Sequence, residues 1–203
     1  KNGAVPGFKG YGGFPAGVCI SVNEQVIHGI PSGRTLKRGD IVSLDAGVYY
    51  KGFHTDAART YAVGECSNEA QALMDAAEQS FYRGFQKART GNRISDISHA
   101  VEEYIKPLGY GIVRDFTGHG VGFELHEDPA IPNYGRPGHG LRIQEGMTLA
   151  IEPMITLGSG DVRILSDGWT TVTRDGSCAA HYENTVAVVD GAPVILTAPD
   201  VSI

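Results

Sequence analysis

The sequence is poor in cysteine, and the arrangement of the few it has argues against scaffolds that depend on this residue. Cys19, Cys66 and Cys178 are odd in number, lie far apart and form no CxxC pair. This pattern argues against a disulfide framework and against a zinc ribbon. It is typical of a protein that stays in a reducing compartment, so we expect a cytoplasmic location.

Basic clusters and long apolar runs are also absent. The net charge is −6, and no block of Lys and Arg alternates with aromatic residues. This balance argues against a direct nucleic-acid site. No apolar run is long enough to span a bilayer, so we expect no membrane segment. The chain begins with Lys1 rather than Met, and we therefore expect part of the natural N-terminus to be missing.

The order of sequence patterns predicts an α+β fold. Short strand-like runs precede and follow two helical stretches in a chain of 203 residues, with no linker between them. The first helix is expected to begin after Ser67 and to end at residues 90–92, and the second to run from about Ser95 to Leu108. We expect one domain, residues 1–203, in which helices cover a curved antiparallel sheet.

Two acids, Asp45 and Asp56, lie in residues 42–60, which read as two strands joined by a tight turn. If the turn residues are Tyr50 and Lys51, the two acids face each other directly. If they are Lys51 and Gly52, the acids are diagonal neighbours on the same face. A cation between them would relieve their repulsion. The alternative interpretation is two hydrated acids on the wet face of a hairpin.

Three later residues can complete a metal site with these acids. His119 lies between two glycines, Glu152 interrupts an apolar strand, and Glu183 stands at the start of another apolar strand. An unpaired carboxylate in an apolar strand would be costly. Four carboxylates and one imidazole from separate strands suit two divalent cations, and oxygen-rich sites of this kind accept Co, Mn, Fe or Zn.

The motifs HGIP, D-x10-D, GHGVGxxxHE, IEPM and YENT follow one another between about Tyr11 and Val189. In this order they resemble the type I methionine aminopeptidases. The resemblance implies the pita-bread fold, with a dinuclear metal site at the centre of the sheet and removal of the initiator methionine from nascent proteins. The metal ligands that it implies are Asp45, Asp56, His119, Glu152 and Glu183.

The resemblance also implies roles for residues that do not bind metal. His28 and His126 correspond to two histidines that contact the substrate. The walls of the methionine pocket would be Tyr11, Phe14, Cys19 and Trp169. Leu125 departs from the aromatic residue expected at its position, which predicts a wider pocket that is still apolar.

The expected reaction is hydrolysis by a water held between two cations. Glu152 would take the proton and pass it to the leaving amine, because its apolar strand raises its basicity. His126 would hydrogen-bond the tetrahedral intermediate, and His28 would hold the peptide on its leaving side. The partner is then the N-terminal peptide of a nascent protein, with contact to the ribosome, and the protein is expected to be a monomer.

Two alternatives remain within the same fold. A proline-specific aminopeptidase or dipeptidase would carry EPG in place of EPM and would lack HGIP. A metal-free member, either a binding module or a hydrolase such as creatinase, would lack the complete ligand set. Type II methionine aminopeptidases carry a long insertion between the two glutamates, whereas Glu152 and Glu183 are only 31 positions apart here.

Overall fold

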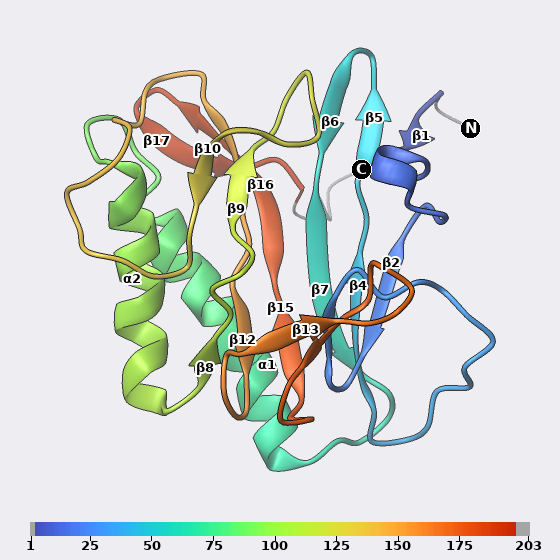
Figure 1. Cartoon of the computed structure of the whole chain (residues 1–203). Coiled ribbons are helices and arrows are strands. Elements are labelled where there is room, and N and C mark those ends of the chain that lie inside the picture. The colour runs from blue at the N-terminus through green and yellow to red at the C-terminus, as the bar shows by residue number, and fades with distance from the viewer. Residues whose placement is uncertain (1–2, 198–203) are drawn as a thin grey trace.

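A computed structural model describes residues 3–197, and Figure 1 shows its arrangement. In these residues the helical elements are α1 (Asn68–Phe85), α2 (Ile94–Ile105) and two short 3-10 helices, η1 (Tyr11–Gly13) and η2 (Lys106–Leu108). The strands are β1 (Val5–Pro6), β2 (Cys19–Val22), β3 (Gln25–Ile27), β4 (Ile41–Asp45), β5 (Val48–Tyr50), β6 (Phe53–Thr55), β7 (Ala57–Ala62), β8 (Gly111–Ile112), β9 (Gly118–Gly120), β10 (Glu127–Ile131), β11 (Thr148–Ile151), β12 (Met154–Thr156), β13 (Val162–Ile164), β14 (Thr171–Thr173), β15 (Ala179–His181), β16 (Glu183–Val189) and β17 (Ala192–Ile195).

A curved antiparallel sheet forms the centre of the molecule. Its strand order is β10-β9-β11-β16-β7-β4-β2, and β17 pairs with β16. Three smaller sheets, β1-β5-β6, β15-β12-β8 and β13-β14-β3, surround it. Figure 1 shows α1 and α2 together on one side of the strands, so the opposite face is left for other contacts. The expected α+β architecture, a curved sheet covered by helices, is confirmed.

Helix α1 begins where the sequence predicts but ends earlier. The Ser67 hydroxyl accepts a hydrogen bond from the Ala70 N–H and caps the helix. The last helical residue is Phe85, before the expected end at residues 90–92. Directly after it the chain tightens, because the N–H groups of Lys87 and Ala88 donate to the carbonyls three residues earlier, and the Thr90 N–H then donates to the carbonyl of Gly191.

Helix α2 begins at Ile94, one residue before the expected start at Ser95, and its N-cap residue is Arg93. The Asp96 carboxylate accepts the Arg93 N–H at 2.7 Å. Ile97 and Ile105 are buried, but Leu108 is 49% exposed and does not extend their apolar stripe. The reason is that residues 106–108 tighten into η2, which changes the angular spacing of the side chains. Neither described helix is long and apolar enough to cross a membrane.

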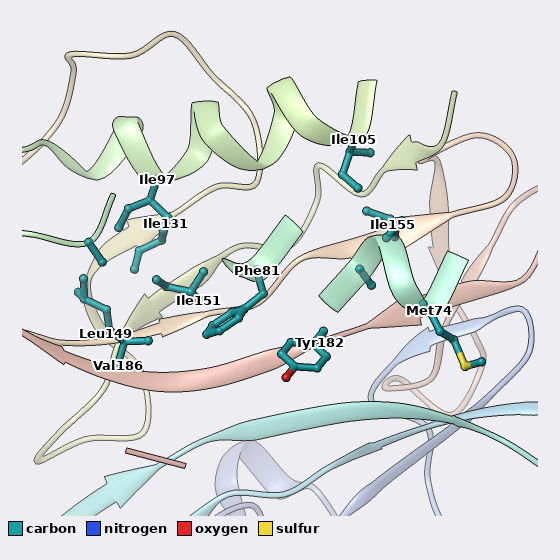
Figure 2. Packing of buried hydrophobic residues seen from close by; sticks show 14 of the residues in the cluster. Met74, Phe81, Ile97, Ile105, Ile131, Leu149, Ile151, Ile155, Tyr182 and Val186 are labelled. Carbon is teal, nitrogen blue, oxygen red and sulfur yellow. The ribbon is translucent and has the colours of Figure 1, made fainter. Parts of the chain in front are cut away.

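The main core lies between the two helices and the sheet, as Figure 2 shows. The Phe81 ring of α1 lies 5.3 Å from the ring of Tyr182, and Ile151 and Val186 of the sheet belong to the same cluster. Full burial of a side chain of this size contributes about 1.5–3 kcal/mol. Strand side chains alternate between faces. Because Val186 faces the helices, Glu183, three residues earlier, faces the other side.

The hairpin that carries the two acids has the second of the two registers considered. Tyr50 pairs with Phe53, so Lys51 and Gly52 form the turn. Both have positive φ, 50° and 91°, as a type I′ turn requires. The same register continues into β4 and β7, where Asp45 pairs with Ala58. Asp45 and Asp56 are therefore diagonal neighbours on one face.

Candidate metal centre

One cavity of about 170 Å³ collects every residue that the sequence predicts for the site. One part of its wall is acidic and the other is aromatic and aliphatic. The lining residues are Phe8, Tyr11, Phe14, Cys19, His28, Asp45, Asp56, His119, Leu125, His126, Glu152, Trp169 and Glu183. Of these, only Phe8 was not predicted.

The five predicted ligands come from five adjacent strands of the central sheet. In sheet order they are His119 on β9, Glu152 directly after β11, Glu183 on β16, Asp56 directly before β7 and Asp45 on β4. All five are buried. A metal ion bound here would lie against the middle of the sheet and hold its strands together.

Potential ligand atoms form two overlapping groups. Asp45, His181 and Glu183 make one, and Asp56, His119 and Glu183 make the other, with the atoms of each group within 4.8 Å of one another. Glu152 adjoins both, because its two carboxylate oxygens lie 3.4 Å from His119 Nε2 and 3.6 Å from His181 Nε2.

The carboxyl groups are too close and too buried to be charged together without a counter-ion. Burial, together with the charge of Asp56, holds the pKa values of Asp45, Glu152 and Glu183 well above their usual range. Burial also raises the pKa of Asp56 to about 7. Divalent cations would replace the protons and remove the repulsion.

Unpaired polar atoms in the cluster fit this role. Among residues 3–197, Asp45 Oδ1, Asp56 Oδ1 and Glu183 Oε1 are buried without a hydrogen-bond partner. Buried polar atoms are rarely left in this state. A set of hard carboxylate oxygens with imidazole nitrogen is the donor set that first-row divalent metals accept. The residues therefore fit a divalent metal centre.

His119 presents one nitrogen to the acids because its other nitrogen is held. Nδ1 lies 2.8 Å from the carbonyl of Gly120, which can only accept, so Nδ1 carries the proton and Nε2 keeps its lone pair. The flanking glycine is required by close strand packing, since a Cβ at Gly118 would lie 2.4 Å from the carbonyl oxygen of Ala150. Burial lowers the pKa of His119 to about 4, which keeps the ring neutral.

His28 has a strained backbone beside the cavity. Its φ is +59°, a value that costs a non-glycine residue about 1–3 kcal/mol. Gly29 follows because a Cβ there would lie 2.2 Å from the carbonyl oxygen of Ile20. The His28 ring lies edge-on to Trp169 at 6.2 Å, and burial lowers its pKa to about 4. The HGIP motif thus places a neutral imidazole at the cavity wall.

His126 lies at the mouth of the cavity, where Tyr11 holds it. The two side chains are joined by a hydrogen bond of 2.8 Å between His126 Nδ1 and the Tyr11 hydroxyl. The His126 ring is 4.2 Å from the His119 ring. Burial and the nearby His54 side chain lower the pKa of His126.

The apolar wall is built mainly from the glycine-rich N-terminal segment. Phe14 meets Trp169 edge to face at 5.2 Å, and Leu125 is only 1% exposed against them. Cys19 is buried beside Asp45, and burial raises the pKa of its thiol. This thiol is therefore protonated at neutral pH and forms part of the apolar wall.

Arg59 fixes the strand that carries Glu183. Its guanidinium donates to the carbonyl of Glu183 and, at 2.6 Å, to the side-chain oxygen of Asn184. It also lies 4.1 Å above the ring of Tyr182. These contacts hold the backbone of the ligand strand from the side opposite to the cavity.

Fold and site together define a metallopeptidase, and comparison with known proteins agrees. The family described as Metallopeptidase family M24 matches residues 2–190, so the chain belongs to it. The methionine aminopeptidase of Clostridium acetobutylicum is 57% identical over 97% of this chain and 79% of its own length. Methionine aminopeptidase 1 of Bacillus subtilis is 50% identical with the same coverage. Within M24, the chain belongs to the methionine aminopeptidases.

Solved structures support the same placement. The crystal structure of methionine aminopeptidase from Thermotoga maritima superposes with a TM-score of 0.94 at 46% identity, over 96% of this chain and 78% of that one. Prolidase from Pyrococcus furiosus gives 0.71 at 26% identity, over 89% of this chain and 48% of that one. The predicted pita-bread fold is confirmed, and the methionine aminopeptidase is the nearer of these two structures.

Two residues in or beside the site were not predicted from the sequence. Phe8 is a third aromatic residue in the same glycine-rich segment as Tyr11 and Phe14, and that clustering was the available signal. His181 belongs to one of the two potential ligand groups. It precedes Glu183 by two positions, so strand alternation could have placed both on the same face.

Proposed function

We propose that this protein removes methionine from the N-terminus of peptides and nascent proteins by metal-dependent hydrolysis. The observation that carries the proposal is the composition of the 170 Å³ cavity, in which buried acids and imidazoles adjoin an apolar wall. The acidic part suits a divalent metal centre, and the apolar part suits a long, uncharged side chain. This combination fits an enzyme that recognises methionine next to the bond it cuts.

The proposed cofactor is a pair of divalent cations, with Co, Mn, Fe or Zn as the candidates. Asp45, Asp56, His119, Glu152 and Glu183 would hold them, and Glu183 belongs to both potential ligand groups. Bound ions of this kind polarise the scissile carbonyl and lower the pKa of water towards neutrality.

Glu152 is the proposed proton carrier. Its carboxylate is buried in the cavity among the other proposed ligands, where it would accept a proton from water at the centre. The same group would then deliver the proton to the leaving amine. Its backbone carbonyl accepts the Asn133 side-chain amide at 2.9 Å, which fixes the segment during this transfer.

His126 and His28 are the proposed substrate contacts. His126 can hydrogen-bond the oxygen of the scissile carbonyl as charge develops on it, because Tyr11 orients the ring and it adjoins His119. His28 stands beside Trp169, from where its neutral imidazole would hold the peptide on the leaving side.

The apolar wall is the proposed methionine pocket. Phe14, Cys19, Leu125 and Trp169 offer aromatic and aliphatic contacts without a charged group. Methionine is unbranched and flexible, and its sulfur packs well against aromatic rings. Tyr11, 42% exposed, would cover the mouth of the pocket rather than its base.

We further propose a single domain that acts as a monomer in the cytoplasm. The substrate class supports the location, since the N-termini of nascent chains become accessible there. Contact with the ribosome would follow from the same substrate.

A peptide panel tests the proposed specificity. Purified protein loaded with Co²⁺ should release methionine from Met-Ala-Ser and leave Ala-Pro peptides intact. Cleavage of Ala-Pro but not of Met-Ala peptides would overturn the proposal in favour of a proline-specific enzyme. Absence of cleavage, with peptides still bound, would instead favour a binding module.

A further inference from the structure

We propose that His181 is a further metal ligand, so that each of the two cation subsites contains its own imidazole. The inference rests on the two-ion centre proposed above and extends its ligand set. The predicted set contains one histidine, His119, whereas the geometry brings a second histidine to the same carboxylates.

The position of His181 follows from the short strands that carry it. Tyr182 belongs to the core cluster beneath the helices, where its ring packs on Phe81. Its neighbours on both sides, His181 and Glu183, therefore face the opposite side, towards the acids. The backbone of His181 is held in place by the Thr60 hydroxyl, which accepts from its N–H and donates to its carbonyl, both at 2.9 Å.

The His181 ring is buried beside the carboxylates of Glu152 and Glu183 but forms no hydrogen bond with either. The residue is 1% exposed, and within residues 3–197 neither Nδ1 nor Nε2 has a hydrogen-bond partner. Nε2 lies 3.6 Å from Glu152 Oε2 and 3.8 Å from Glu183 Oε2. These separations are long for hydrogen bonds. A buried imidazole without any partner destabilises the fold unless something else satisfies its nitrogens.

The same separations suit atoms that share one cation. Two ligands about 2.1 Å from an ion at a tetrahedral angle lie about 3.4 Å apart. The distance from His119 Nε2, a predicted ligand, to Glu152 Oε1 is 3.4 Å, close to the 3.6 Å that separates His181 Nε2 from Glu152 Oε2. Both imidazoles therefore stand in the same relation to Glu152, one at each of its oxygens.

The resulting centre has a simple pairing. Asp45 and His181 belong to one subsite, Asp56 and His119 belong to the other, and Glu183 is common to both. A nitrogen ligand in each subsite favours Fe, Co, Ni and Zn over Mg and Mn, which prefer oxygen. In a five-ligand centre, by contrast, one subsite would contain only carboxylates.

X-ray absorption at the cobalt edge can count the imidazoles without an activity assay. The protein is stripped with chelator and loaded with two equivalents of Co²⁺, and the spectrum is fitted for imidazole scattering. We expect an average of one imidazole per cobalt. One imidazole for every two cobalt ions would overturn the inference, since His119 alone accounts for that value.

A variant then identifies the histidine concerned. His181→Gln keeps a side chain that can donate hydrogen bonds to the acids but removes the imidazole, and exposed His139→Gln is the matched control. We expect His181→Gln to weaken one of the two Co²⁺ affinities about 10–100-fold and to lose one imidazole from the spectrum. Unchanged affinities and spectrum would contradict the inference.

The same samples separate this inference from the proposed function. Wild-type protein that releases methionine but shows only His119 as imidazole ligand would retain the function and refute the role of His181. A centre with two imidazoles in a protein that never releases methionine would support the role of His181 and refute the proposed function. Circular dichroism of His181→Gln checks its folding, and the wild-type spectrum tests the inference if that variant does not fold.

Discussion

Asp45 and Asp56 are diagonal neighbours on one face of the sheet, because Asp45 pairs with Ala58 and Asp56 lies two residues earlier. The type I′ turn at Lys51 and Gly52 sets this register, and one extra turn residue would move one acid to the other face. The strand pairs β5–β6 and β4–β7 continue this register as far as the two acids. The geometry of the turn therefore determines how the two acids lie relative to each other.

Substitution of Asp56 should remove metal and activity together. Asp56→Asn keeps the size of the side chain but removes the charge of a buried ligand in one of the two groups. We expect Co²⁺ affinity to fall at least about 100-fold, with loss of methionine release, as measured by calorimetry and a peptide assay. Exposed Asp115→Asn is the control and should change neither. A variant that retained both ions would show that Asp56 is not a ligand.

Substitution of His126 should separate metal binding from catalysis. Its ring is fixed by the Tyr11 hydroxyl and lies beside the ligand cluster without belonging to either group. His126→Ala should therefore keep its metal, while kcat falls about 100–1000-fold through loss of a donor to the developing negative charge. Metal analysis of the purified variant checks this directly. Loss of an ion would mean that His126 binds metal itself.

Truncation of Leu125 should change the choice of N-terminal residue. Leu125 is buried in the apolar wall with Phe14 and Trp169. Leu125→Ala removes contact area from the methionine side chain, so kcat/KM for Met-Ala-Ser should fall about 10-fold or more. Peptides with N-terminal Phe should lose less, because the cavity becomes larger. Leu141→Ala, at an exposed position, controls for stability, and an equal loss for both peptides would place Leu125 outside the pocket.

The stability of the metal-free protein should fall as pH rises above neutrality. Burial holds the pKa values of Asp45, Glu152 and Glu183 well above their usual range and raises that of Asp56 to about 7. The folded protein therefore retains carboxyl protons that the unfolded chain has already lost. Because the folded state binds more protons, the free energy of unfolding decreases with pH until these groups ionise.

The useful window runs from about pH 7.5 to about pH 8.5, where the histidines of the unfolded chain, with a pKa near 6.5, are mostly neutral and add little to the slope. Each carboxyl group that keeps its proton contributes a slope of up to about 1.4 kcal/mol per pH unit. Urea unfolding of chelated protein at both pH values measures the difference. Asp56→Asn should have a shallower slope than wild type. Stability that rises across this window would contradict the proposed clustering.

The sequence predicted more of the site than of the local structure. Asp45, His119, Glu152 and Glu183 could be placed together because each motif marks a strand and the motif order matches a known family. The end of α1 could not be predicted, because the chain already tightens into i→i−3 hydrogen bonds at Lys87 and Ala88, before the turn residues 90–92. Likewise, Leu108 fits a helical stripe in sequence, and only the tightening into η2 turns it outwards.

The hairpin and His181 show two different limits. Both turn registers around Lys51 were compatible with the sequence, and the observed strand pairing shows which one forms. His181 carried a signal in its two-residue spacing from Glu183, but a histidine near an acid is common and becomes informative only when burial and unpaired nitrogens are known. The two-residue spacing of His181 and Glu183 suggests that they share a face of the strand. The 3.8 Å between their side chains shows that they share a site.

The most direct test of the central claim is methionine release as a function of bound metal. Protein stripped by chelator, and shown by metal analysis to be free of divalent ions, is titrated with Co²⁺ while release from Met-Ala-Ser is followed. We expect no release at the start, and recovery that stops increasing once two ions are bound per chain. Full release from the verified metal-free protein would contradict the account.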